Sequence, residues 1–101
     1  MRVARERGVR VRRELLNSDP PARCSPQLLE TLSAACEERA IPHRHMVSRA
    51  YHDSLFMARI APIAMVFIPC RNGVSHRPDE YTSPEAIATG VTVLAEALGT
   101  F

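Results

Sequence analysis

Two short segments contain the residues that are able to support catalysis or metal binding. The first reads SRAYHDS and places His52 directly before Asp53, and the second reads GVSHRPDEY and places His76 four positions before Glu80. A neutral imidazole nitrogen is a good ligand for a divalent metal ion, and a carboxylate either binds the same ion or orients the imidazole. These residue types are the ones that a hydrolytic metal site uses.

The spacing of these residues does not by itself identify a metal site. Neither segment contains the HExxH pattern, and Pro78 lies between His76 and Glu80, so the two do not form a helical i, i+4 pair. A structural histidine therefore remains the alternative in both segments. We expect His43 and His45 to lie in a connector, and we assign them no role.

Two helices are predicted to position these segments. Ser25 followed by Pro26 is typical of an N-cap with proline at the first helical position, and apolar side chains on one face predict a helix that ends near Ala40. Thr82 and Glu85 have the spacing of a capping box and predict the start of the final helix. This final helix would cover the apolar strand that precedes it in the sequence.

Three further segments are predicted to be extended. Residues 9–16 alternate between apolar and polar side chains, which is typical of a half-buried strand, and residues 41–47 are a connector or a short strand. Residues 63–68 are a continuous apolar run, as in a strand covered on both faces. A short helix is expected after Asp53. This mixture predicts an α/β fold with a site in the polar loop from Pro69 to Tyr81, after the buried strand.

Composition narrows the class of protein. The chain has 101 residues, of which 46% are hydrophobic and 24% are charged, and this favours one small globular unit or part of a larger one. The longest apolar run, residues 61–67, is about a third of the length of a membrane helix, so no membrane span is predicted. A net charge of +2 does not predict a nucleic-acid partner, and three cysteines without CxxC spacing indicate free thiols.

The longer sequence around the two histidine segments resembles a known family. SRAYHDSLFMARI, an apolar strand and GVSHRPDEYTSPEAIATGVTVL follow one another as they do at the C-terminal end of the amidohydrolase branch of the dinuclear metallopeptidase superfamily. That branch contains ureidoglycolate, allantoate and N-carbamoyl-L-amino-acid amidohydrolases. Most members carry a glycine-rich SGAGHDA-type motif where this chain reads SRAYHDS. The version found here, with Glu80 and Tyr81 ending the second motif, is similar to plant and green-algal ureidoglycolate amidohydrolases.

The resemblance implies a role for each candidate residue. His76 matches the last metal ligand of the family, and Tyr51 and His52 match a pair that faces the substrate. A phenol in place of glycine would narrow the pocket and add a donor, which would favour a smaller ureido acid over allantoate. Asp53 would orient His52 or cap the following helix, and Glu80 would brace the His76 loop. A helix cap and a surface charge remain the alternatives for these two carboxylates.

The family chemistry implied by this resemblance is metal-assisted hydrolysis of a ureido C–N bond. Two divalent ions, usually Mn²⁺ with Zn²⁺ as the alternative, lower the pKa of a bridging water, and a glutamate acts as general base. The small-molecule substrate would be ureidoglycolate, and the products would be glyoxylate, ammonia and carbon dioxide. The family resemblance further implies a homodimer, no nucleic-acid partner and, by analogy with plant relatives, the endoplasmic reticulum.

The implied fold is the C-terminal piece of a three-layer α/β/α dinuclear metallohydrolase domain, preceded by the last strand of an α+β lid. Residues 1–22 would end the lid or dimerisation domain, and residues 23–101 would belong to the catalytic domain. The other metal ligands and the general base precede this region in the family, so we expect the isolated chain to be inactive. Two alternatives remain: an allantoate or N-carbamoyl-L-amino-acid amidohydrolase, against which Tyr51 argues, and a truncated non-catalytic interaction module or pseudogene product.

Overall fold

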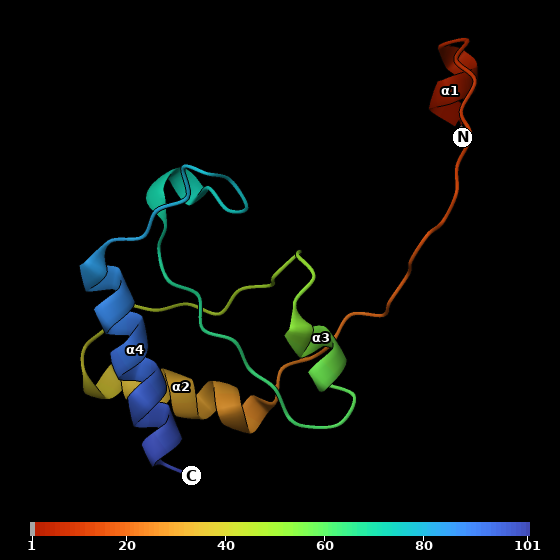
Figure 1. Cartoon of the computed structure of the whole chain (residues 1–101). Coiled ribbons are helices and arrows are strands. Elements are labelled where there is room, and N and C mark those ends of the chain that lie inside the picture. Colours follow the sequence, from red (N-terminus) through yellow and green to blue (C-terminus); the bar gives the residue numbers. More distant parts are fainter. Residues whose placement is uncertain (1) are drawn as a thin grey trace.

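The computed structural model describes residues 2–101, and its regular elements are all helical (Figure 1). In chain order they are α1 (Arg2–Glu6), α2 (Pro26–Glu38), α3 (Asp53–Met57), the 3₁₀ turn η1 (Arg71–Gly73) and α4 (Pro84–Gly99). The two long helices, α2 and α4, pack against each other, and irregular segments carry the short elements around this pair.

Helix α2 begins and ends where its sequence predicts. The Ser25 hydroxyl accepts a hydrogen bond from the Leu28 amide at 3.5 Å, and proline follows at the first helical position. At the other end Ala40 has a positive φ of 52°, and the Ile41 amide donates to the Cys36 carbonyl at 2.9 Å. This left-handed residue closes the helix in the manner usual for glycine or asparagine.

Helix α4 begins one residue later than the predicted capping box. Its N-cap is Ser83, whose hydroxyl accepts from the Ala86 amide at 3.2 Å, and Pro84 occupies the first helical position. The prediction that Thr82 caps the helix was therefore wrong. Serine before proline provides the cap here because the fixed φ of Pro84 suits the first helical position, as it also does at the start of α2.

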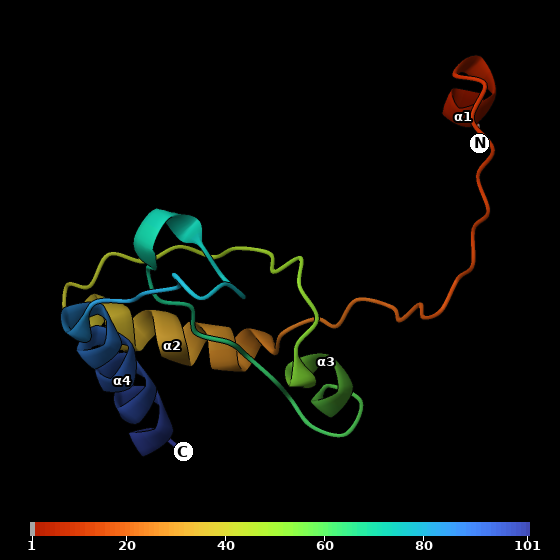
Figure 2. The same ribbon diagram turned by 45° about the horizontal axis from the view of Figure 1, so that its top comes forward.

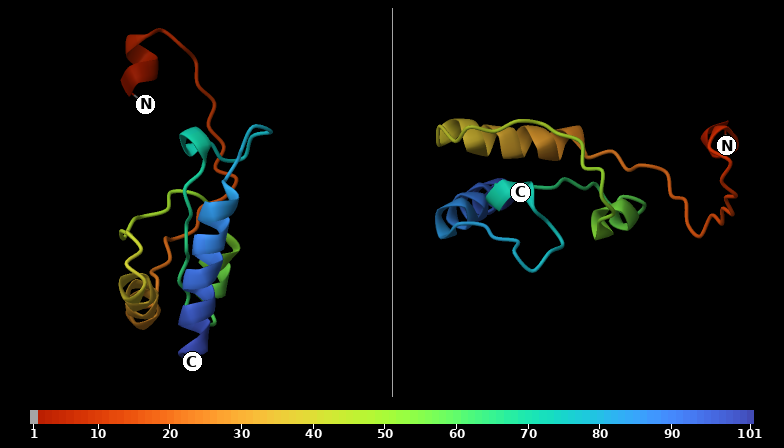
Figure 3. Two further views of the ribbon diagram at one scale, coloured as in Figure 1. Left: turned by 90° about the vertical axis from the view of Figure 1, so that its left-hand side faces the viewer. Right: turned by 90° about the horizontal axis from the view of Figure 1, so that it is seen from above.

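The core lies between α2 and α4, which run past each other in two layers (Figure 3). Three small or medium side chains form the buried cluster, each with no more than 7% of its surface exposed: Ala35, Cys36 and Val93. Ala97 of α4 is buried as well. Two partly buried side chains, Leu32 and Ile41, pack against this cluster. Small residues at the contact allow the two helices to approach closely.

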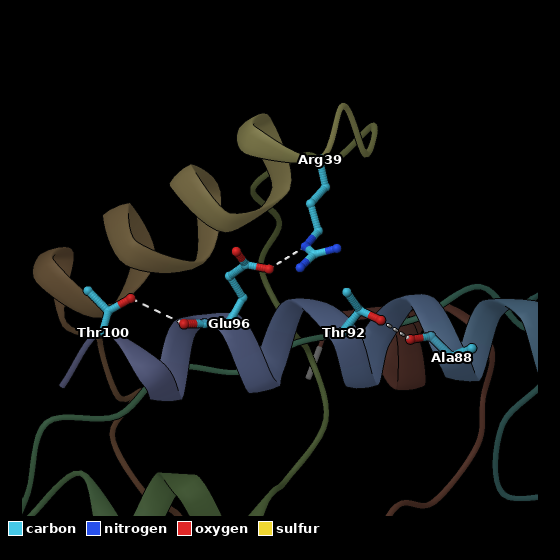
Figure 4. Close-up of polar contacts among 5 residues, drawn as sticks. All are labelled: Arg39, Ala88, Thr92, Glu96 and Thr100. Atoms are coloured by element: carbon cyan, nitrogen blue, oxygen red, sulfur yellow. Dashed lines mark hydrogen bonds and ion pairs between the residues drawn. The ribbon is translucent and has the colours of Figure 1, made fainter.

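Polar groups join the two helices along the edge of the core (Figure 4). The guanidinium of Arg39, at the end of α2, forms an ion pair with the carboxylate of Glu96 on α4. The hydroxyls of Thr92 and Thr100 donate to the carbonyls of Ala88 and Glu96 at 2.9 and 3.2 Å, one turn earlier in α4. The ion pair is therefore a polar link between the end of α2 and the C-terminal half of α4.

The predicted strands are not formed within residues 2–101. Residues 9–16 and 63–68 are extended, but no neighbouring segment supplies the ladder of hydrogen bonds that makes a strand. Residues 41–47 are a connector, which was one of the two alternatives predicted for them. Residues 66–68, expected to be covered on both faces, keep between 37% and 47% of their surface exposed. The apolar pattern was present, but its packing partners are not among these residues.

The described chain is much more extended than a packed domain of the same size. Its radius of gyration is 18.6 Å, against about 13 Å for a compact chain of 100 residues. Helix α1 lies at the far end of an extended arm, away from the α2–α4 pair (Figures 1 and 2). Within residues 2–101 no helix is both long and apolar enough to cross a membrane.

Candidate functional site

The loop that carries His76 is closed at its base. The Arg71 amide donates to the Tyr81 carbonyl at 2.8 Å, and the Arg71 guanidinium carbon lies 4.3 Å from the centroid of the Tyr81 ring. A guanidinium at this distance from an aromatic face makes a cation–π contact. A main-chain hydrogen bond and a side-chain contact therefore hold the two ends of the loop together, directly before α4.

His76 lies at the turn of this loop in a left-handed conformation, with φ of 59°. Such a φ is uncommon for a residue with a side chain, and it must be stabilised by its surroundings. The His76 amide donates to Glu80 Oε2 at 2.9 Å, and Arg77 forms a two-pronged ion pair with Asp79 at 2.9 and 2.8 Å. Glu80 therefore binds the backbone of His76, not its ring.

His52 is contacted on two sides. Its Nε2 atom lies 2.6 Å from the hydroxyl oxygen of Ser48, and its ring centroid lies 5.7 Å from that of Phe67 at a tilt of 60°. The Ser48 oxygen also accepts a hydrogen bond from the Ala50 amide at 3.3 Å. The half-buried His52 ring is thus held by an exposed serine and an aromatic residue of the apolar segment 63–68.

The two residues beside His52 differ in their surroundings. Tyr51 keeps 57% of its surface exposed, so its phenol is accessible to a small molecule. Asp53 is the first residue of α3, and His52 is the N-cap. An acidic residue in the first turn interacts favourably with the helix dipole. Within the described chain, the hydrogen-bond partner of the His52 ring is Ser48 and not Asp53.

The remaining histidines lie in the connector after α2, as predicted. His45 Nε2 lies 3.0 Å from the Ser33 hydroxyl, and His43 Nδ1 lies 3.3 Å from the Ile41 carbonyl. A shallow groove between α2 and α4 runs beside Arg39 and Glu96, and none of the predicted site residues lines it. The groove and the candidate chemistry are therefore in different places.

The cysteines take no part in the candidate site. Over residues 2–101 all three are free thiols, which confirms the prediction from their spacing. Cys36 lies in the helix–helix core, where burial raises the pKa of its thiol and the neighbouring Glu37 carboxylate adds to the shift. A thiol that resists ionisation is a poor nucleophile and a poor metal ligand. Cys36 is therefore a packing residue.

The structure does not bring the two histidine segments together. Helix α3, which follows His52, and η1, which precedes His76, lie apart in both ribbon views (Figures 1 and 2). Across residues 2–101 no three His, Cys, Asp or Glu side chains are grouped closely enough to hold a metal ion. These residues alone therefore do not fit a catalytic metal pair, and His76 would need ligands from elsewhere.

Sequence reasoning missed two features of the site. It did not identify Ser48 as the partner of His52, because a serine four positions before a histidine is a common pattern in irregular chain. It also did not predict the left-handed backbone at position 76, because the residue there is histidine and not glycine or asparagine, which adopt this conformation most readily. In hindsight Pro78 and the Asp79-Glu80 pair were the signals of a tight, carboxylate-stabilised turn.

Comparisons with known proteins agree with the sequence resemblance. The chain is 47% identical over 97 residues to a ureidoglycolate hydrolase of Arabidopsis thaliana, which covers 95% of this chain and 20% of that protein. It is 40% identical over 96 residues to an N-carbamoyl-L-amino-acid amidohydrolase of a Pseudomonas strain, covering 95% of this chain and 23% of the relative. With the allantoate amidohydrolase of Escherichia coli it shares 38% identity over 82 residues, 81% of this chain and 20% of the relative.

The chain thus spans about a fifth of the length of the curated relatives that it matches. No solved structure gives a significant match. The sequence profile of peptidase family M20/M25/M40 matches residues 7–100, which is nearly the whole chain and includes both histidine segments. This chain belongs to peptidase family M20/M25/M40.

Proposed function

We propose that this chain forms the C-terminal part of a metal-dependent amidohydrolase that cleaves a C–N bond of a linear ureido acid, with ureidoglycolate as the substrate. The products would be glyoxylate, ammonia and carbon dioxide. The observation that carries the proposal is the order of identities: 47% to a ureidoglycolate hydrolase, against 40% and 38% to relatives named for other ureido substrates. Within the SRAYHDS segment of this chain, Tyr51 is accessible.

His76 is proposed as one ligand of a divalent ion, Mn²⁺ or alternatively Zn²⁺. Imidazole suits either ion when carboxylates complete the ligand set. In support, the His76 amide is bound by Glu80 while neither ring nitrogen has a hydrogen-bond partner among residues 2–101. The other ligands and the general base would come from outside these residues, so the chemical step cannot take place on this chain alone.

Tyr51 and His52 are proposed to bind the substrate. Both side chains combine an aromatic ring with atoms that form hydrogen bonds, and they follow one another directly before α3. A phenol at position 51 offers a donor and occupies volume that glycine would leave open. The smaller ureidoglycolate would then be accepted in preference to allantoate, because the larger substrate would overlap the ring. Asp53 would act through the α3 dipole and Glu80 through the His76 turn.

The proposed architecture accounts for the apolar surface of this chain. Residues 23–101 would join a three-layer α/β/α catalytic domain in which residues 63–68 pair with other strands, and residues 1–22 would end a lid through which the enzyme dimerises. In support, residues 66–68 and several large side chains of α4 are exposed here, among them Ile87, Val91, Leu94 and Leu98. The endoplasmic reticulum is proposed as the compartment.

A chimera tests this proposal. The C-terminal fifth of the Arabidopsis ureidoglycolate hydrolase would be replaced by the 97 aligned residues of this chain, and ammonia release would be measured with Mn²⁺ present. We expect turnover of ureidoglycolate, its loss in His76→Ala and its retention in His43→Ala, a matched histidine outside the site. A folded chimera without turnover would support the non-catalytic interaction module instead.

The allantoate and N-carbamoyl-amino-acid alternatives are separated by the substrate profile of the same chimera. Tyr51→Gly is expected to broaden its range toward allantoate, since glycine opens the pocket and removes the phenol donor. Tyr51→Phe, which keeps the volume and removes only the hydroxyl, distinguishes exclusion by size from hydrogen bonding. A profile that is the same in all three proteins would remove the reason for preferring ureidoglycolate.

A further inference from the structure

The His52 ring has one polar edge already occupied. Nε2 is within hydrogen-bond distance of Ser48 Oγ, and Phe67 lies against the ring. Nδ1 is therefore the ring nitrogen left to meet a ligand. Whether it meets that ligand as a donor or as an acceptor depends on which nitrogen of the neutral imidazole carries the proton.

The length of the contact between Ser48 and His52 assigns its proton. The separation of 2.6 Å lies below the range of about 2.7–3.2 Å for bonds that an N–H group donates to oxygen. The Ser48 oxygen also accepts the Ala50 amide hydrogen at 3.3 Å, which leaves one of its two lone pairs open and so does not set the direction. The short distance favours the serine hydroxyl as donor and Nε2 as acceptor.

The pair formed by Ser33 and His45 shows that this geometry is not shared by every serine–histidine contact in the chain. Those two atoms lie 3.0 Å apart, a distance that either direction of donation allows. No second donor to the Ser33 hydroxyl is present in the described part of the chain. The short distance and the second donor therefore distinguish Ser48 from a matched contact elsewhere in this chain.

We infer that Ser48 is a positioning residue that holds neutral His52 with its proton on Nδ1. The Nδ1–H would then donate to an oxygen of the bound substrate, a carbonyl or carboxylate oxygen of the ureido acid; only this naming of the ligand rests on the proposed function. Asp53, in contrast, begins α3 and is not the hydrogen-bond partner of the ring. The serine therefore takes the orienting role that a carboxylate often has.

Nitrogen NMR of the chain labelled with ¹⁵N at histidine tests the tautomer directly, at about pH 8.5, where an ordinary imidazole is neutral. Long-range proton–nitrogen correlations show which ring nitrogen carries the proton. We expect the Nδ1–H form at His52, conversion in Ser48→Ala to the Nε2–H form that free histidine prefers, and restoration in Ser48→Thr. Ser33→Ala, the matched control, should leave the His52 signals unchanged.

An Nε2–H form at His52 in the unmodified chain would overturn the inference, and so would a tautomer that does not change in Ser48→Ala. A second readout uses the chimera, where loss of one positioned hydrogen bond is expected to raise KM roughly 3- to 10-fold with kcat little changed. The NMR result does not depend on turnover. A tautomer shift in a chimera without activity would retain the role of Ser48 and refute the proposed function.

Discussion

The contact between Gly90 of α4 and Ile68 of the apolar segment leads to a quantitative prediction. A Cβ added at Gly90 would lie 2.5 Å from Ile68 Cγ2, whereas carbon atoms in contact are about 3.5–4.0 Å apart. Gly90→Ala therefore requires a displacement of about 1 Å. Cγ2 is attached directly to the branched Cβ of isoleucine, so it cannot move without rotation of χ1 or a shift of the backbone.

Two opposing effects set the size of the change. Inserting a methyl group into a filled site costs about 1–3 kcal/mol, and replacing glycine by alanine within a helix stabilises it by roughly 0.5–1 kcal/mol. Ile68 is 37% exposed and has some room to yield, which places the cost in the lower half of its range. We expect Gly90→Ala to lower the free energy of unfolding by about 1 kcal/mol.

A double-mutant cycle measures this clash separately from helix propensity. The free energies of unfolding are measured by urea titration, followed by the circular dichroism signal of the helices. Every sample contains the same concentration of trimethylamine oxide, an osmolyte that stabilises the folded state. In the Ile68→Ala background Cγ2 is absent, so Gly90→Ala should stabilise the chain. Gly99→Ala is the matched control, since nothing lies within 4 Å of a Cβ at that position. Equal stabilisation by Gly90→Ala in both backgrounds would refute the contact.

Three further predictions follow from features described above. Ser83→Ala should lower the free energy of unfolding by about 1 kcal/mol in the same urea titration, and Ser83→Asp should lower it much less, because aspartate also caps helices. Equal losses in the two variants would mean that the cap contributes nothing. Burial raises the pKa of Cys36 in the folded state, so the contribution of its neutral thiol to the free energy of unfolding is complete below the ordinary thiol pKa of 9.0 and is lost as pH rises through the higher folded value. Cys36→Ala should flatten this fall above pH 9.0, and a parallel fall in both proteins would contradict it. The isolated chain with Mn²⁺ and ureidoglycolate should show no turnover above that of His76→Ala.

The long helices were predictable because their signals are local. Serine followed by proline marks the start of both α2 and α4, and an apolar face repeats along each helix. The error of one residue at the α4 cap arose because Thr82 and Ser83 are adjacent and both are able to cap a helix. Neighbouring residues alone do not show which hydroxyl reaches the amide three positions later.

The extended segments and the site were predictable only in part. Alternating or continuous apolar residues indicate which faces of a strand would be buried, but the strand forms only when adjacent strands pair with it. Residues 63–68 have the apolar pattern and no adjacent strand within residues 2–101. The residue types of the candidate site were identified from the sequence, but the Ser48–His52 contact depends on backbone angles that no spacing encodes. Pro78 and the Asp79-Glu80 pair indicate a turn after His76 without predicting its left-handed backbone. Within residues 2–101 the two histidine segments lie apart, and nothing in their spacing predicts this arrangement.

The apolar run 63–68, half-buried at residues 63–65 and exposed at residues 66–68, has a consequence for association between copies of the chain. Six apolar residues without a charge and rich in β-formers form the type of sequence that self-associates into stacked β-sheets. Pro62 and Pro69 lie directly at its two ends, and neither has an N–H to donate. These prolines limit any intermolecular ladder to the six residues between them, so they act as gatekeepers against aggregation until the segment is covered.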